Sequence, residues 1–243
     1  MATTCDLFLD GQVSVSQPAD GFRAGIDAVL LAAALSAKPG SLVLDAGCGA
    51  GTAMLCAAHR MTECRFLGLE IDPAMAALAR RNIEANVMTS RVEVIGGDVA
   101  DPPDLPTVNR VFFNPPFFDD PSALRAPKPG KQAAYTSPTA NLEAWIRLTR
   151  RVLRPKGRVV LIHRADALGD VLALIGKGFG DVAIKPIQPR PGSDAKRVII
   201  SAKRGSKSPL RLLPPLALHD DAGGKYSAKA EDILRGRAVI EMG

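Results

Sequence analysis

Short apolar runs alternate with segments of helical spacing along most of the chain. The run 41–45 is followed by helical periodicity over 52–60, and the same order repeats further along. Continuous apolar runs of this length are typical of strands buried on both faces, and their alternation with helices indicates an α/β fold with a doubly wound, mostly parallel sheet. Strands are predicted at 41–45, 65–69, 92–95, 110–113 and 158–162, and helices at 52–60, from Pro73 onward, at 141–153 and at 168–175.

The N-terminal region carries a different pattern. Residues 1–20 are polar with alternating Val13 and Val15, which predicts a short strand or hairpin laid against the domain. The stretch 26–37 is an apolar helical run that contains Asp27. A carboxylate in the first helical turn complements the helix dipole, so Asp27 either serves the helix in that way or faces a ligand.

Pro39 and Gly40 break the chain between this region and the strand–helix series. We therefore expect residues 1–40 to form an N-terminal extension and a helix packed on the core. Residues 41–243 are expected to form a single globular domain. Its sheet should close with a strand pair at 182–187 and 197–202, in which the last strand is antiparallel.

Composition narrows the class of protein. The chain has 243 residues, of which 47% are hydrophobic and 23% charged, so one domain can bury a sizeable core. The net charge of +6 suits a polyanionic partner, although many basic proteins are merely soluble. Four cysteines without a C-x-x-C pair match no zinc site, and neither a signal peptide nor a bilayer-spanning run is present. We expect a reduced cytoplasmic protein without a metal or membrane partner.

A glycine-rich turn follows the strand 41–45. Asp45 is followed by Gly47, Gly49 and Gly51, which would let the backbone approach a ligand, as in nucleoside-binding folds. A dinucleotide fingerprint needs a glycine or alanine where Thr52 stands, so the match to a nicotinamide site is imperfect. A carboxylate directly before the glycines suits a positively charged ligand. S-adenosyl-L-methionine, which carries an ammonium and a sulfonium, is the predicted cofactor.

Acidic residues also end the next two strands. Glu70 would accept hydrogen bonds from the ribose hydroxyls, and Asp98 would meet the adenine amine. Their neighbours Ile71 and Val99 are included in the predicted cofactor site. The alternative is a bare dinucleotide-fold scaffold with helix caps at these positions.

The strand 110–113 ends abruptly at Asn114-Pro115-Pro116-Phe117. Two prolines remove two backbone donors, so the loop presents the Asn114 side-chain oxygen and carbonyl acceptors beside an aromatic ring. A planar ring with an exocyclic NH₂ group fits such a site, next to the activated methyl group, and Asn114 is therefore also included in the predicted cofactor site. An edge strand ending in a proline-stiffened turn, with core phenylalanines, is the alternative interpretation.

Taken together, four motifs resemble the class I S-adenosylmethionine-dependent methyltransferases, which have a Rossmann-like sheet. They are, in order, Asp45-Ala-Gly-Cys-Gly-Ala-Gly, Gly68-Leu-Glu-Ile-Asp, Gly96-Gly-Asp98 and Asn114-Pro-Pro-Phe. The proline motif matches the methylators of amino groups, with Phe117 where tyrosine is the other choice. The resemblance narrows further on three segments that are similar to the bacterial tRNA1(Val) adenine N(6)-methyltransferase family, namely 20–31, Tyr135-Thr136 and 225–228.

The resemblance implies roles for several residues. Asp45, the turn glycines, Glu70 and Asp98 would hold the cofactor, and Phe22 and Asp27 would lie near its methionine end. Asn114, Pro115 and Phe117 would hold the target base. The implied reaction is methyl transfer to an exocyclic amino group of RNA, adenine N(6) in tRNA being favoured. Catalysis would rest on positioning and electrostatics, with no general base at the start.

Other functions remain open at this stage. The same proline loop serves guanine amino-methylation in ribosomal RNA and glutamine methylation in release factors. A binding module without turnover and a nicotinamide oxidoreductase are further alternatives. Two basic stretches would supply phosphate contacts if the partner is RNA, and solvated surface otherwise. They are 119–134, with Arg125, Lys128 and Lys131, and 185–211, with Arg190, Lys196, Arg197, Lys203, Arg204, Lys207 and Arg211.

Overall fold

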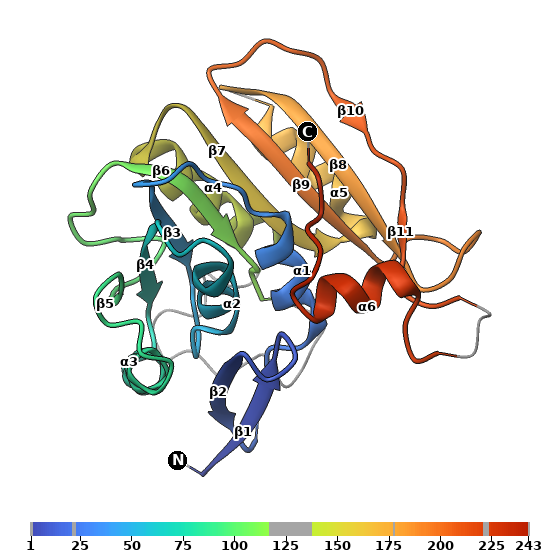
Figure 1. Cartoon of the computed structure of the whole chain (residues 1–243). Helices are drawn as coiled ribbons and strands as arrows, with labels where there is room; N and C mark the ends of the chain where they lie inside the picture. Colours follow the sequence, from blue (N-terminus) through green and yellow to red (C-terminus); the bar gives the residue numbers. More distant parts are fainter. Residues whose placement is uncertain (1, 21–22, 117–137, 177, 221–223, 243) are drawn as a thin grey trace.

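The computed structural model describes residues 2–20, 23–116, 138–176, 178–220 and 224–242, with backbone alone for 138–141. A small N-terminal hairpin, β1 (Thr3–Phe8) and β2 (Val13–Pro18), stands beside a large α/β unit (Figure 1). The predicted N-terminal hairpin is therefore confirmed. Val13 and Val15 are fully buried, because alternate side chains of β2 point into the same core.

The central sheet has the order β10-β8-β9-β7-β6-β3-β4-β5, with β11 paired to β8. Strands β3 to β7 pair in parallel, and β9 runs antiparallel to both β7 and β8. This confirms the doubly wound, mostly parallel sheet with an antiparallel last long strand. The strands are β3 (Leu42–Ala46), β4 (Arg65–Glu70), β5 (Val92–Gly96), β6 (Val108–Phe113), β7 (Leu153–Arg164), β8 (Phe179–Gln188), β9 (Arg197–Arg204), β10 (Arg211–Leu212) and β11 (Leu216–Ala217).

Helices cover both faces of this sheet, because successive residues of its strands point to opposite sides. Val43 and Phe112 belong to one buried cluster, whereas their neighbours Leu44 and Phe113 belong to another. The first cluster takes in α1 (Ile26–Ala34), α2 (Thr52–Arg60), α3 (Pro73–Ala85) and α6 (Ala228–Leu234), and the second takes in α4 (Pro138–Val152) and α5 (Leu168–Ile175) (Figure 1).

Local sequence explains how α3 starts. Pro73 occupies the first helical position, as predicted, and the Asp72 carboxylate accepts the backbone N–H groups of Ala74 and Met75. Asp27 lies in the first turn of α1, also as expected. Apolar residues on both sides of Gly40 share the first core cluster, and the division of the chain at residue 40 stays a prediction.

The structure differs from expectation mainly at the C-terminal half. Helix α4 ends at Val152 and β7 begins directly at Leu153, whereas the strand was predicted to begin only at residue 158. Its first residues include Pro155 and Lys156, and Lys156 has a positive φ. The two-residue strands β10 and β11 and the helix α6 were not predicted. The predicted strand pair at 182–187 and 197–202 is confirmed, and the basic stretch 185–211 overlaps it, because β8 extends to Gln188 and β9 occupies Arg197–Arg204.

Two absences hold for the described residues. No helix among them is both long and apolar enough to cross a membrane. No group of three histidine, cysteine or acidic residues within the described ranges is arranged to hold a metal ion. The four cysteines form no disulfide; Cys48, Cys56 and Cys64 are buried and Cys5 is exposed.

Candidate active site

The carboxyl ends of the parallel strands bring the predicted site residues to one edge of the sheet. Asp45 lies near the end of β3, Glu70 ends β4, and Asn114 directly follows β6. The chain adds β4 and β5 on one side of β3 and then β6 and β7 on the other, so the strand order reverses beside β3. Open α/β sheets bind ligands at such a reversal.

The turn after β3 depends on glycine. Gly47, Gly49 and Gly51 have φ values of +73°, +56° and +88°, a region that side-chain-bearing residues rarely adopt. The N–H of Gly47 donates to the Leu69 carbonyl at 2.8 Å. A Cβ atom at Gly47 would lie 3.2 Å from Cζ2 of Trp145 in α4. The turn is therefore held closely between β4 and α4.

A pocket opens against this turn. It is lined by Gln17, Ala24 and Ala28 from the N-terminal region, by residues between Asp45 and Ala53 in the turn and α2, and by Met75 and Asn114. The structure therefore brings together four predicted residues from two strands, namely Asp45, Gly47, Gly49 and Asn114.

Three side-chain oxygens in this pocket are buried and lack a hydrogen-bond partner in the described chain. They are Asp45 Oδ2, Thr52 Oγ1 and Asn114 Oδ1. Because buried polar atoms are nearly always satisfied, these atoms indicate a ligand that brings donors. The ammonium of S-adenosylmethionine and the amine of an acceptor base are such donors. The residues present thus fit the predicted cofactor.

Electrostatics favour a cation in the pocket. Asp45 is 2% exposed, and burial, followed by the nearby Glu70 carboxylate, raises its pKa well above the usual range. An ionised Asp45 is costly in this position without a positive partner. A bound ammonium group would relieve that cost and return the pKa towards its ordinary value.

Glu70 connects the glycine turn to the next helix. Its Oε2 accepts the Gly49 N–H at 2.8 Å, and its Oε1 accepts the Asp72 N–H at 2.9 Å. Burial raises its pKa, although these two backbone bonds oppose the rise. Each carboxylate oxygen keeps a second lone pair, so the predicted role towards ribose hydroxyls stays available as a prediction.

Other predicted cofactor residues lie outside the pocket lining. Asp98 follows β5 and its Oδ1 accepts a backbone N–H two residues on at 2.8 Å, while Val99 is buried in the second core cluster. Ile71 is 57% exposed beside the site. Asp27 forms an ion pair with Arg197 at 3.0 Å, which joins α1 to the start of β9. Their roles towards the cofactor stay predictions.

The proline loop is described in part. Pro115 is buried and Pro116 exposed, so the first proline anchors the loop while the second faces outward. Asn114 is half-buried and lines the same pocket as Asp45, and its Oδ1 is buried without a hydrogen-bond partner among the described residues. Phe117 and Phe22 lie outside the described residues, as does the predicted basic stretch around Arg125.

Sequence reasoning missed several residues of the pocket. Gln17, Ala24 and Ala28 reach it from the N-terminal region, and Met75 reaches it from α3. Trp145 donates from Nε1 to the Ala46 carbonyl at 3.0 Å, behind the turn. Met75 and Trp145 belong to no motif. Ala24 and Ala28 fall within the segment 20–31 that resembles the family, and Gln17 is a polar residue among the alternating apolar residues of β2, but no role was predicted for these three.

A model of the family described as the methyltransferase small domain matches residues 23–185, which span the glycine turn, the acidic strand ends and the Asn-Pro-Pro loop. The chain belongs to this methyltransferase family. It is an S-adenosylmethionine-dependent methyltransferase, as the resemblance of its motifs implied.

Two relatives of this methyltransferase carry the same name. A protein of Porphyromonas gingivalis named tRNA1(Val) (adenine(37)-N6)-methyltransferase is 32% identical over 205 residues, covering 80% of this chain and 79% of the relative. A protein of the same name from Dickeya chrysanthemi is 28% identical over 237 residues, covering 92% and 90%.

Solved structures agree on the fold of the methyltransferase. A predicted O-methyltransferase from Agrobacterium tumefaciens superposes with a TM-score of 0.74 at 29% identity, covering 88% of this chain and 98% of that one. TrmN from Thermus thermophilus superposes with a TM-score of 0.54 at 20% identity, and the match covers 73% of this chain and 48% of the TrmN chain. The second likeness concerns the fold alone.

Proposed function

We propose that this enzyme methylates the exocyclic amino group of an adenine in tRNA. The observation that carries the proposal is a pocket lined by both Asn114 and Asp45, whose buried oxygens Oδ1 and Oδ2 have no hydrogen-bond partner among the described residues. One acceptor suits an amine to be methylated, and the other suits the ammonium of the methyl donor. Their common pocket would bring the two substrates together.

The cofactor is proposed to lie along the glycine turn. Asp45 would bind the ammonium group of the cofactor. The glycines of positive φ, which have no side chains, would leave room for the rest of the cofactor along the turn. Glu70, held by the N–H groups of Gly49 and Asp72, would present its remaining lone pairs to hydroxyl groups. S-adenosylmethionine supplies an electrophilic methyl group on its sulfonium.

Asn114 is proposed to hold and orient the accepting nitrogen. An aryl amine is a weak nucleophile because its lone pair is delocalised into the ring. Two hydrogen bonds, to Asn114 Oδ1 and to the Pro115 carbonyl, would favour a pyramidal nitrogen with its lone pair directed at the methyl group. The contribution is positioning and electrostatic, and the proton leaves only after transfer, when the nitrogen has become acidic.

RNA is favoured as the substrate on two grounds. The net charge is +6, and the relatives that cover most of the chain are named as tRNA adenine methyltransferases. A base in a single-stranded loop is splayed out at little cost, and so reaches a pocket at the edge of a sheet. Guanine and glutamine also offer a planar NH₂ group and are outcomes of the test.

A transfer assay tests the proposal. The purified enzyme is incubated with tritiated methyl donor and, separately, total tRNA, ribosomal RNA and protein from cells lacking the enzyme. We expect label in tRNA, and digestion to nucleosides should yield N6-methyladenosine. Label in ribosomal guanine or in a protein glutamine would replace the substrate assignment while keeping the site. Label on oxygen would overturn the role of the Asn114 acceptor.

A further inference from the structure

The pocket has two walls that come from distant parts of the chain. One wall is the glycine turn, including Ala50, and the other includes Ala24, from the segment before α1. No strand pairing joins these walls directly. The helices that follow the two walls, α1 and α2, pack against each other. The N-terminal hairpin provides a further link, because its strand β2 is bonded to both walls through buried amide side chains.

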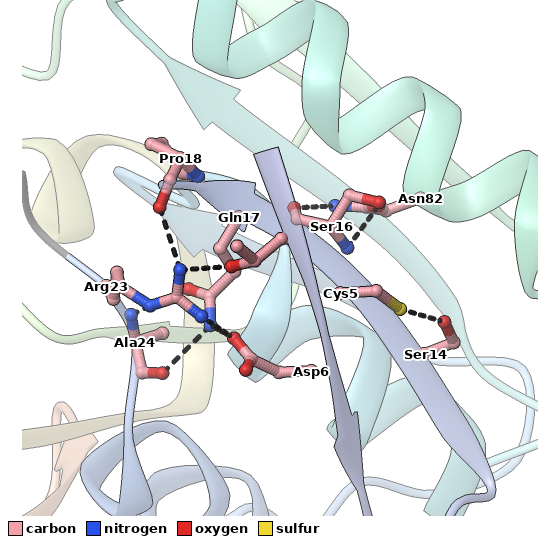
Figure 2. A network of polar contacts seen from close by, with 10 residues as sticks. Cys5, Asp6, Ser14, Ser16, Gln17, Pro18, Arg23, Ala24 and Asn82 are labelled. Carbon is pink, nitrogen blue, oxygen red and sulfur yellow. Dashed lines mark hydrogen bonds and ion pairs between the residues drawn. The ribbon is translucent and has the colours of Figure 1, made fainter. Parts of the chain in front are cut away.

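Asn82 in α3 links the hairpin to the glycine turn. Its Oδ1 accepts the Ser16 N–H at 2.9 Å, and its Nδ2 donates to the Ser16 carbonyl at 2.9 Å and to the Ala50 carbonyl at 2.9 Å (Figure 2 shows its pairing with Ser16). The side chain is 2% exposed. The amide therefore uses three of its hydrogen bonds to hold Ser16 and Ala50 together.

Gln17 links the hairpin to the other wall. Its Oε1 accepts the Ala24 N–H at 2.7 Å, and its Nε2 donates to the Ala24 carbonyl at 3.1 Å and to Asp6 Oδ2 at 2.7 Å. Arg23 pairs with the same Asp6 carboxylate (Figure 2). Gln17 is 2% exposed and also lines the pocket, so the residue that fixes Ala24 faces the cofactor site as well.

We propose that Asn82 and Gln17 are positioning residues for the cofactor, which together set the width of its pocket. The role rests on the proposed cofactor site. The path runs from Ala50 through Asn82 to Ser16, and from the adjacent Gln17 to Ala24, through hydrogen bonds that are buried or partly buried. According to this proposal, the N-terminal hairpin helps to position the residues that line the cofactor pocket.

The chain contains a matched control, Asn86, one helical turn beyond Asn82. Its Oδ1 accepts the Ser14 N–H at 3.0 Å, and its Nδ2 donates to the carbonyls of Ser14 at 2.6 Å and Asn82 at 2.7 Å. Asn86 therefore binds the same strand with the same amide group and the same number of hydrogen bonds. Unlike Asn82, it makes no bond to the glycine turn.

Calorimetric titration with S-adenosylhomocysteine compares Asn82→Ala with Asn86→Ala. Both variants lose three hydrogen bonds, so both should melt at a lower temperature than the parent. We expect Asn82→Ala to weaken binding by about tenfold or more, and Asn86→Ala to change it by no more than about twofold. Gln17→Met, which keeps the length of the side chain and removes its amide, should weaken binding as Asn82→Ala does.

Steady-state kinetics separate positioning from a general loss of structure. At saturating cofactor, Asn82→Ala and Gln17→Met should keep a kcat within about threefold of the parent while the KM for the cofactor rises. Hydrogen exchange on the unaltered protein gives a readout that needs no variant. Adding S-adenosylhomocysteine should slow exchange at the amides of Ser16 and Ala24 more than at Ser14.

The outcomes distinguish the two proposals. If the unaltered protein binds no S-adenosylhomocysteine, the cofactor site itself is wrong and the positioning role falls with it. If the unaltered protein binds, yet Asn82→Ala and Asn86→Ala weaken binding equally, the positioning role alone is overturned. Unchanged exchange at Ser16 and Ala24 in the bound protein overturns it too, even where a variant fails to fold.

Discussion

Two oxygen atoms, Asp45 Oδ2 and Asn114 Oδ1, give the pocket its preference for donors. Both are buried and have no hydrogen-bond partner among the residues that the structure describes, which costs on the order of 1–3 kcal/mol for a neutral group and more for a charged one. The free-energy cost of these unsatisfied acceptors is offset when a bound ligand donates hydrogen bonds to them. The two atoms therefore favour ligands that carry N–H groups, such as the ammonium of the methyl donor and the amine of the acceptor base.

The first prediction concerns Asn114→Ala. Turnover should fall by about 10² or more, the usual scale for one positioned polar group, while the affinity for S-adenosylhomocysteine changes little. Single-turnover methyl transfer and calorimetry measure the two effects. Asn109→Ala is the control, because Asn109 lies on the same strand and its Oδ1 accepts the Leu42 N–H at 2.9 Å, away from the pocket. Loss of cofactor affinity with intact turnover in Asn114→Ala would contradict the assigned role.

The second prediction concerns pH. Burial raises the pKa of Asp45 in the ligand-free protein, and the ionised form is the one that attracts an ammonium group. Affinity for S-adenosylhomocysteine should therefore be full above that raised pKa and weaken as the pH falls through it, with proton release on binding at lower pH. Calorimetry in buffers of different ionisation enthalpy measures this.

Asp45→Asn keeps the shape of Asp45 and removes its charge. Binding should weaken by about tenfold, which corresponds to about 1.4 kcal/mol, and should lose most of its pH dependence. Asp72→Asn is the matched control, since an asparagine caps α3 equally well and Asp72 does not line the pocket. An unchanged pH profile in Asp45→Asn would show that another group binds the ammonium.

At the scale of elements, the packing of α4 behind the glycine turn restricts the turn to glycine. Gly47 and Gly40 have nearly equal φ values of +73° and +75°, but only Gly47 has a neighbour, Trp145, within reach of an added Cβ. The pair separates backbone strain from the contact with α4.

The third prediction uses this pair. Gly40→Ala should lower the free energy of unfolding by about 1–2 kcal/mol, through left-handed strain alone. Gly47→Ala should lower it further and also weaken cofactor binding, because the added methyl group pushes against the Trp145 ring. Urea unfolding and calorimetry measure both. Equal losses of stability in the two variants, with cofactor binding intact, would contradict the prediction. They would show that α4 shifts to accommodate the added methyl group without disturbing the turn.

Elements with a clear period were predictable from sequence, and so were the site residues next to them. Asp45, Glu70 and Asn114 end strands whose apolar runs are unmistakable, so their common edge followed from parallel topology. The strands β10 and β11 have two residues each and show no period. Asn82 contacts Ser16 at a separation of 66 residues in sequence, which no local pattern encodes. Gln17 bonds to Ala24 only seven residues away, but the segment between them carries no periodic pattern that predicts this contact.

At the scale of the whole molecule, the antiparallel β9 divides the basic residues between two edges. Lys196 precedes β9 and lies at the edge where β7 ends, since Arg164 of β7 pairs with Arg197. Lys207 follows β9 and lies at the opposite edge, near the start of β8, where Gly205 donates to the Gly178 carbonyl. Only the first edge is the edge of the pocket.

The fourth prediction follows from this division. Lys196→Glu should weaken tRNA binding and reduce its dependence on salt by about one unit of slope, as expected when one phosphate contact is lost. Lys207→Glu makes the same change of charge at the other edge and should leave binding within about twofold. Filter binding across a salt series measures both. Equal effects of the two variants would indicate a role for net charge alone.

The packing of Trp145 against the glycine turn has a practical consequence. It is the single tryptophan of the chain, and its indole donates to the Ala46 carbonyl beside Gly47. Intrinsic fluorescence excited at the indole therefore originates from one position, directly behind the cofactor pocket. The native protein thus carries its own optical reporter, through which ligand entry and local loosening of the turn are followed without any attached dye.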